Sequence, residues 1–164
     1  NYKLVINASG LVLIIAGLLG WYVFENLSVY PYYLTYFNQL AGGPTGGYRF
    51  VVDSNLDWGQ DLLRLSQWVK QNQLPKIELD YFGWADQTYY LGDRFIWLTA
   101  NKYSSVQDFL QRNQSDGWLA VSATFLQGSR GIPDKPAIIN YDNWLKTQTP
   151  VTVIGNSIFV YQLK

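Results

Sequence analysis

The chain has 164 residues and carries 12 basic and 12 acidic side chains, so its formal net charge is zero. It contains no His and no Cys, which excludes disulfides, zinc–thiolate sites, haem ligation by His and His-based acid–base catalysis. The sequence shows no basic run, so we expect no nucleic acid among its partners.

The first feature along the chain is a charge-free apolar segment at residues 4–24. A helix of about 20 apolar residues crosses the roughly 30 Å of bilayer hydrocarbon. A buried core helix would show a polar face, and a signal peptide would end in small residues at a cleavage site. This segment has no polar face and ends in the aromatic run 21–24, which is typical of a membrane interface. We therefore expect residues 1–29 to form a transmembrane helix with its flanks.

The ends of this segment bear on orientation and context. Lys3 precedes the apolar run, and the positive-inside rule then favours a cytoplasmic N-terminus. We therefore expect an integral membrane protein whose domain lies on the extracytoplasmic side, periplasmic or lumenal. Position 1 is not Met, so we expect the chain to be an internal or C-terminal piece of a longer protein, or a processed product.

Residues 30–47 form an aromatic segment followed by a Gly-rich loop. The aromatic part, 30–37, has two interpretations: rings lying at headgroup depth along the membrane, or ordinary core aromatics of the domain. The loop at 41–47 lacks the GK[ST] or GxGxxG spacing of nucleotide-binding loops. We expect 30–47 to be an interfacial segment and linker, and 48–164 to be the extracytoplasmic domain.

The domain alternates strand-like and helix-like patterns. The predicted strands are 48–52, 76–82, 95–98, 118–123, 151–154 and 157–162, and the predicted helices are 57–72, 105–112 and 142–147. Gly155-Asn156 is a strong signal for the turn of a C-terminal hairpin. The order predicts an α/β fold: a layered domain with a mainly parallel sheet and a C-terminal antiparallel hairpin.

The densest polar cluster follows the first predicted strand and runs into the first predicted helix of the domain. Ligands in open α/β sheets bind at such strand ends. Carboxylates and amides suit sugar hydroxyls or a divalent cation, and a Trp ring stacks on the apolar face of a sugar. The alternative is structural, with the acids capping the helix and complementing its dipole. The candidate ligand-binding residues of this cluster are Asp53, Asn55, Asp57, Trp58, Gln60 and Asp61.

A second candidate pair, Ser122 and Thr124, follows a later predicted strand. These hydroxyls would lie near the first cluster if the two strands are neighbours. Without a His, Ser122 has no usual base for a hydrolase triad, so we expect no catalytic residue here. The acidic string also lacks the spacing of an EF-hand loop. A divalent cation is therefore a possible cofactor without a recognised motif, and a sugar- or metal-binding module is one interpretation of the domain.

Several segments resemble bacterial multi-span glycosyltransferases of the family 39 type, which are related to protein O-mannosyltransferases and aminoarabinose transferases. The most specific is Asp-Ser-Asn-Leu-Asp-Trp-Gly-Gln-Asp at residues 53–61. The other similar segments are 30–44, 81–83, 122–124, 126–128 and 150–161. The resemblance implies the last membrane helix and the extracytoplasmic C-terminal domain of an enzyme that transfers a sugar from a polyprenyl-phosphate carrier.

The same resemblance implies that this chain alone is inactive. The catalytic acid of that family lies in the first external loop between early membrane helices, a region that has no counterpart in this sequence. The domain would then help acceptor recognition or cover the active site, with membrane lipid, the remaining spans and a polyprenyl-linked sugar as partners. The alternative is a single-span accessory subunit of a larger membrane complex that kept a transferase-like domain without activity.

Overall fold

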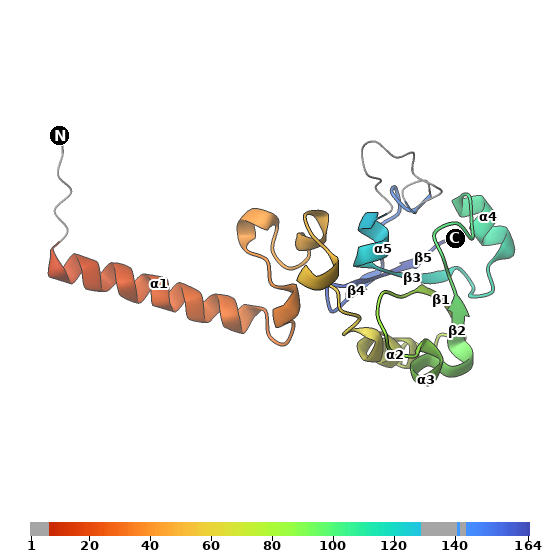
Figure 1. The fold of residues 1–164 in the computed structure, drawn as a ribbon, viewed down its shortest axis with the longest axis horizontal. Helices are drawn as coiled ribbons and strands as arrows, with labels where there is room; N and C mark the ends of the chain where they lie inside the picture. The colour runs from red at the N-terminus through yellow and green to blue at the C-terminus, as the bar shows by residue number, and fades with distance from the viewer. Residues whose placement is uncertain (1–6, 129–140, 142–143) are drawn as a thin grey trace. The chain divides into compact units, whose positions relative to one another are not determined.

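The structure is a computed structural model that describes residues 7–128, 141 and 144–164. It divides into two compact units, residues 1–33 and 34–164. The first unit contains helix α1, Ala8–Ser28, drawn in red to orange in Figure 1. The Asn7 side chain caps this helix by accepting a 2.7 Å hydrogen bond from the Gly10 N–H. Apolar residues lie all around the helix, and it is long and apolar enough to cross a membrane.

In the described residues, the second unit is built on a five-stranded sheet with the strand order β2-β1-β3-β5-β4. Its strands are β1 (Ile77–Asp80), β2 (Phe95–Trp97), β3 (Trp118–Ser122), β4 (Thr152–Ile154) and β5 (Ile158–Gln162). Strands β2, β1 and β3 are parallel, whereas β5 is antiparallel to both β3 and β4. The α/β class is confirmed. The sheet is mixed rather than mainly parallel, because the C-terminal hairpin pairs along the whole length of β3.

Helices cover both faces of this sheet. They are α2 (Leu62–Gln71), α3 (Gln87–Leu91), α4 (Val106–Arg112) and α5 (Ala123–Gly128). In the view of Figure 1, α2 and α3 lie below the sheet, and α4 and α5 lie above it. The alternation of strand side chains divides the core accordingly. Leu119 and Val121 join one cluster with Phe109 of α4, while Ala120 joins the other with Leu65 of α2.

Two local signals gave correct boundaries. The Ser105 side chain caps α4 by accepting a 3.1 Å hydrogen bond from the Asp108 N–H. In the β4–β5 turn, Gly155 and Asn156 have φ values of +59° and +66°, and the Ser157 N–H donates a 3.1 Å hydrogen bond to the Ile154 carbonyl. Both features depend on a few adjacent residues, which is why the sequence alone predicts them.

Other predictions were wrong. Residues 48–52 do not form a strand; the short 3-10 helix η3, Gly47–Arg49, lies there instead, and the Tyr48 ring packs on Phe159 with centroids 4.6 Å apart. Helix α2 begins at Leu62 rather than at Asp57, so residues 57–61 form a loop. Helices α3 and α5 were not predicted. Residues 144–147 form a turn, and the start of the predicted helix at 142 lies outside the described residues.

Candidate functional site

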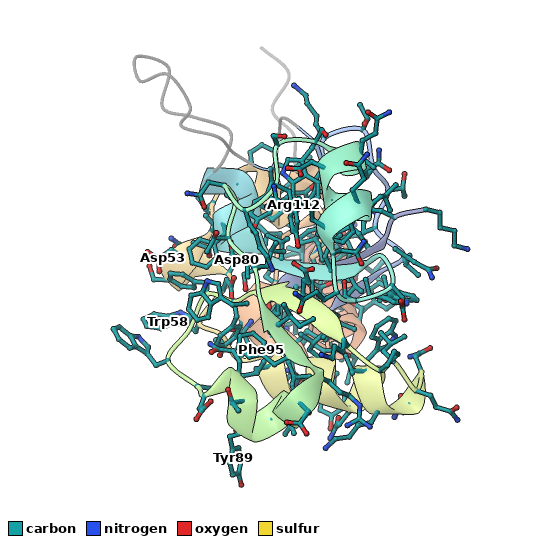
Figure 2. The ribbon with its side chains drawn as sticks, turned by 90° about the vertical axis from the view of Figure 1, so that its right-hand side faces the viewer. Asp53, Trp58, Asp80, Tyr89, Phe95 and Arg112 are labelled. Atoms are coloured by element: carbon teal, nitrogen blue, oxygen red, sulfur yellow. The ribbon has the colours of Figure 1, made fainter. Side chains whose placement is uncertain are left out.

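A pocket of about 370 Å³ opens beyond the carboxyl end of strand β1 and beside helix α5. Its volume lies in the range typical of small-molecule sites. Figure 2 shows Asp53, Trp58 and Asp80 on the same side of the domain, with Asp80 ending β1. The residues that line the pocket are Asp53, Trp58, Tyr81, Phe82, Gly83, Trp84 and Phe125.

The loop that carries Asp53 is fixed to the start of α5 by Thr124. The Asp53 N–H donates a 3.1 Å hydrogen bond to the Thr124 Oγ1 atom. The Thr124 hydroxyl donates in turn to the Asp57 Oδ2 atom at 3.3 Å, and the Gly59 N–H donates to Asp57 Oδ1 at 3.1 Å. Asp53 itself has a left-handed φ of +54°, a conformation that Asp adopts more readily than most residues. The loop is therefore held in one shape before any ligand arrives.

Trp58 presents a fixed aromatic surface to the pocket. Its indole Nε1–H donates a 2.9 Å hydrogen bond to the Ser54 carbonyl, and its backbone N–H donates to the Gln60 Oε1 atom at 2.7 Å. Even so, 59% of the residue is exposed. Because the polar edge of the ring is bonded within the loop, a ligand at this residue would meet mainly the apolar part of the ring.

The opposite wall is the segment that directly follows β1. The Phe82 N–H donates a 2.9 Å hydrogen bond to the Ser122 Oγ atom, which ties the end of β1 to the end of β3. The Phe82 ring meets Phe125 of α5 edge-on, with centroids 5.8 Å apart. Trp84 is fully exposed. This wall is therefore aromatic and comes from two elements that lie far from residues 53–61 in the sequence.

The structure divides the predicted site residues into two groups. Asp53 and Trp58 line the pocket, and Thr124 bonds to the backbone of Asp53. Asp57, Asp61 and Ser122 are buried with partners from the protein itself. Their side chains build the scaffold of the site.

The remaining predicted residues fit the same division. Asp61 accepts a 2.7 Å hydrogen bond from Ser157 of the hairpin turn and forms an ion pair with Arg64. The Gln60 amide holds the backbone of Trp58 and donates to the Leu56 carbonyl. Asn55 is exposed and does not line the pocket. Ligand contact by these residues remains a prediction, whereas their structural contacts are visible.

Two carboxyl groups at the site, those of Asp57 and Asp80, are largely removed from water. Burial raises the pKa of Asp57 to about 6, although hydrogen bonds from Gly59 and Thr124 oppose the shift. Burial also raises the pKa of Asp80 to about 6, against a 2.6 Å hydrogen bond from the Tyr141 hydroxyl. Among the residues that the structure describes, no Lys or Arg lines the pocket. The lining residues therefore suit a neutral or cationic ligand better than an anionic one.

The described residues contain no cluster of side chains that could bind the possible divalent cation. No group of three acidic side chains converges there in a way that could hold a metal ion. The physical reason lies in the loop, because Asp57 and Asp61 direct their oxygens to Thr124 and Ser157. Only Asp53 of the three carboxylates lines the pocket.

A larger hollow, of about 460 Å³, lies beside β5 and Leu126 of α5. Its described lining residues include no carboxylate and none of the predicted site residues. Its lining residues are Tyr48, Leu126, Leu145, Lys146, Gln148, Pro150, Phe159 and Tyr161. The smaller pocket is the better candidate because it joins a fixed carboxylate-bearing loop to an aromatic wall at the carboxyl ends of parallel strands.

Comparisons of the chain with protein families, curated proteins and solved structures found no match. Asp53 and Trp58 were predicted as site residues from the sequence, whereas Tyr81, Phe82, Trp84 and Phe125 were not. Phe82 ends the predicted strand 76–82 and Trp84 follows it, and this position at a strand end was the available signal.

Proposed function

We propose that the pocket binds a sugar ring, and that the chain is the non-catalytic C-terminal part of a membrane glycosyltransferase that uses a polyprenyl-phosphate carrier. The domain would hold the acceptor or cover the active site. The observation that carries the proposal is the pairing of Asp53 with the fixed, half-exposed ring of Trp58 in one pocket. The resemblance of residues 53–61 to family 39 transferases supports the same conclusion.

The chemistry of a sugar ring matches this pairing. One face of a pyranose is apolar and packs on an aromatic ring, while the hydroxyls on its edge donate to an acceptor. A carboxylate accepts such hydrogen bonds through two oxygens, and charge-assisted bonds are about twice as strong as neutral ones. Asp53 supplies the carboxylate, and Trp58 and Trp84 supply aromatic surface.

The charge of the pocket indicates which part of a polyprenyl-linked sugar it would bind. None of the described residues that line the pocket is basic, so the carrier phosphate would find no cationic partner among them. A carboxylate at the same site would repel it. The proposal is therefore restricted to the sugar ring or to a sugar-bearing acceptor.

The membrane part of the proposal relies on α1. This helix has the length and composition of a span, and Lys3 before it favours a domain on the extracytoplasmic side. Acceptors of polyprenyl-linked sugars are met on that side of the membrane, as the resemblance implies. A protease-protection assay on right-side-out and inverted vesicles tests the orientation, and cleavage of the domain only in inverted vesicles would contradict it.

Sugar binding is tested on the full chain in lipid nanodiscs, because sugar-based detergents would compete for the pocket. Titration calorimetry with glucose, mannose, galactose and their short oligosaccharides measures affinity. We expect Trp58→Ala and Asp53→Asn each to weaken binding at least tenfold. The matched control is Trp97→Ala, which removes a 63% exposed Trp of β2 that lies outside the pocket. Equal effects of Trp58→Ala and Trp97→Ala, or no binding of any saccharide, would overturn the proposal.

The parent enzyme is tested separately by isolating the natural polypeptide from its membrane. The proposal expects one polypeptide with further membrane spans preceding these residues and with transferase activity on polyprenyl-linked sugars. A shorter polypeptide that co-purifies with a separate multi-span body would instead support the accessory subunit. Sugar binding by the pocket could survive that second result, so the two parts of the proposal are judged independently.

A further inference from the structure

The second unit begins with a segment, residues 34–51, that turns apolar side chains outward. Leu40 is 95% exposed and Phe50 is 65% exposed. Exposed apolar residues gathered in one short segment are unusual for a surface that faces only water. The exposed apolar side chains of this segment, called the apolar rim below, are Leu34, Tyr36, Leu40, Phe50 and Val51.

The rim is held outward because neighbouring residues are fixed inward. Thr35 is buried and accepts a 3.0 Å hydrogen bond from Asn156 of the β4–β5 turn. The Phe37 ring lies directly against Gly47, where a methyl group would collide with it. Tyr48 packs on Phe159. The rim therefore belongs to the folded unit, and its exposure does not result from a loose tail.

The segment carries a single charge, and that charge is positive. Between residues 34 and 52 the only charged side chain is Arg49, and the first acid is Asp53. Aromatic and aliphatic side chains beside a single cation fit the boundary between headgroups and acyl chains, where aromatic rings and basic residues are enriched. Anionic headgroups complement the charge of Arg49.

Chain length limits how far the rim can lie from the end of α1. Leu34 follows Ser28, the last residue of α1, by six residues, and an extended residue spans at most about 3.5 Å. Leu34 is therefore within about 20 Å of the helix end, and Leu40 within about 40 Å. If α1 spans a bilayer, as the proposed function requires, the rim is confined close to the bilayer surface at high effective concentration.

We propose that the apolar rim inserts into the bilayer interface, so that this unit contacts lipid through Leu40 and Phe50 rather than hanging free on a linker. Lipid is favoured over a protein partner because tethering next to α1 and the single Arg49 charge both match a headgroup layer. The inference rests on the membrane anchoring in the proposed function, and it does not depend on the sugar pocket.

The test uses the absence of Cys in the natural chain. Leu40→Cys and Phe50→Cys each carry one nitroxide label, and the full chain is reconstituted in vesicles of phosphatidylcholine and phosphatidylglycerol. Electron paramagnetic resonance then compares the accessibility of each label to oxygen, which enriches in lipid, and to a water-soluble nickel chelate. Val151→Cys is the matched control, because Val151 is apolar and 56% exposed but lies outside the rim. Ile14→Cys reports on α1 itself.

We expect the Leu40 and Phe50 labels to be oxygen-accessible and protected from nickel, and the Val151 label to be open to nickel. Nickel access at Leu40 and Phe50 equal to that at Val151 would overturn the inference while leaving the span intact, provided that Ile14 lies in lipid. Protection from both reagents would also overturn it, since it would indicate contact with protein. Nickel access at Ile14 would show that α1 is not inserted, and the membrane anchoring would fail with the inference.

Discussion

The Tyr81 hydroxyl donates a 2.6 Å hydrogen bond to the backbone carbonyl of Gly59, a residue 22 positions earlier in the sequence. This bond joins the end of β1 to the loop that carries Asp53 and Trp58. Burial raises the pKa of Tyr81 above its usual value, so the hydroxyl keeps its proton and donates at neutral pH. The two walls of the pocket are thereby held together at one point.

Removing the Tyr81 hydroxyl tests whether this hydrogen bond holds the two walls of the pocket together. We expect Tyr81→Phe to lower the free energy of unfolding by about 1 kcal/mol, because the Gly59 carbonyl loses its partner while the ring still packs. Urea unfolding followed by circular dichroism measures the change, and saccharide titration of the same variant should show weaker binding. The control is Tyr89→Phe, which removes a hydroxyl from an exposed residue of α3. A loss of stability in both variants alike would contradict the role of the bond.

The close contact between Tyr81 and the loop that carries Asp53 and Trp58 also requires a glycine at position 59. A methyl group there would collide with the Tyr81 hydroxyl and lie 2.8 Å from the Gly83 Cα atom, and the φ of +73° adds backbone strain. We expect Gly59→Ala to cost clearly more than Gly92→Ala. Gly92 also has a positive φ, of +58°, but nothing lies within 4 Å of an added methyl group.

The pair of glycine variants separates strain from crowding. Gly92→Ala should lose about 1 to 3 kcal/mol of unfolding free energy through backbone strain alone, because a φ of +58° with a ψ of −137° is a conformation that residues other than Gly rarely adopt. The additional loss in Gly59→Ala measures the steric contact between the two loops. Thermal unfolding of both variants under one condition gives the comparison, and equal midpoints would show that the loops do not need this close approach.

Asp57 makes stability depend on pH in a defined direction. Its carboxyl has a pKa of about 6 in the folded chain and an ordinary value of 3.8, so the folded state binds the extra proton between these values. The free energy of unfolding should therefore fall as the pH rises from about 4 to about 6. For this one group the slope is at most about 1.4 kcal/mol per pH unit, and Asp80 adds a change of the same sign.

The contribution of Asp57 is isolated by Asp57→Asn, which keeps the shape of the side chain and removes its titration. Urea unfolding at roughly pH 3.5, 5 and 6.5, which brackets the range from about 4 to about 6, should give a flatter profile in the variant than in the natural chain. Asp93→Asn, at an exposed position, should keep the natural slope. Parallel profiles for the natural chain and Asp57→Asn would refute the assignment.

A buried ion pair away from the pocket offers a fourth prediction. Glu78 of β1 is fully buried and accepts hydrogen bonds from the Lys102 ammonium at 2.8 Å and from the Tyr103 hydroxyl at 2.9 Å. Lys102→Ala would leave the carboxylate with neutral donors only. We expect a loss of roughly 2 kcal/mol in unfolding free energy, below the usual cost for a fully buried pair because the Lys102 side chain is 30% exposed.

The control for this pair is Lys70→Ala, which removes an exposed cation from the last turn of α2. Surface substitutions of this kind usually change stability by less than about 0.5 kcal/mol. Chemical unfolding of both variants at neutral pH measures the difference. If Lys102→Ala is as mild as Lys70→Ala, the ammonium does not compensate the buried charge of Glu78.

The parts of the fold that the sequence predicted are those with local causes. The apolar run predicted α1, and the Gly155-Asn156 pair predicted the hairpin. Prediction failed at residues 48–52, where β-branched and aromatic residues favour a strand but Gly46 and Gly47 begin a 3-10 turn. The Tyr48 ring packs against Phe159 of β5, although Tyr48 itself belongs to no strand. The spacing of apolar residues in the sequence cannot reveal such a tertiary contact.

Only part of the candidate site could be predicted from the sequence, for a similar reason. Asp57 resembles a helix N-cap in the sequence, yet its carboxylate bonds to Gly59 and to Thr124 of a distant helix, so α2 begins later. Asp53 and Trp58 stood out as a polar and an aromatic residue in one string. The aromatic wall formed by Phe82 and Phe125 depends on which strands are neighbours, and this order is set by the whole sheet.

The position of β5 in the sheet has a consequence for synthesis. It is the last strand in the sequence but lies between β3 and β4, and it pairs with all five residues of β3. As the chain emerges from the ribosome, β1, β2 and β3 are made first, and β3 keeps an unpaired edge until β5 follows. Such an edge is a template for pairing with another chain. Nascent chains lacking residues 158–162 are therefore the form most exposed to aggregation, and they need protection until the final strand closes the sheet.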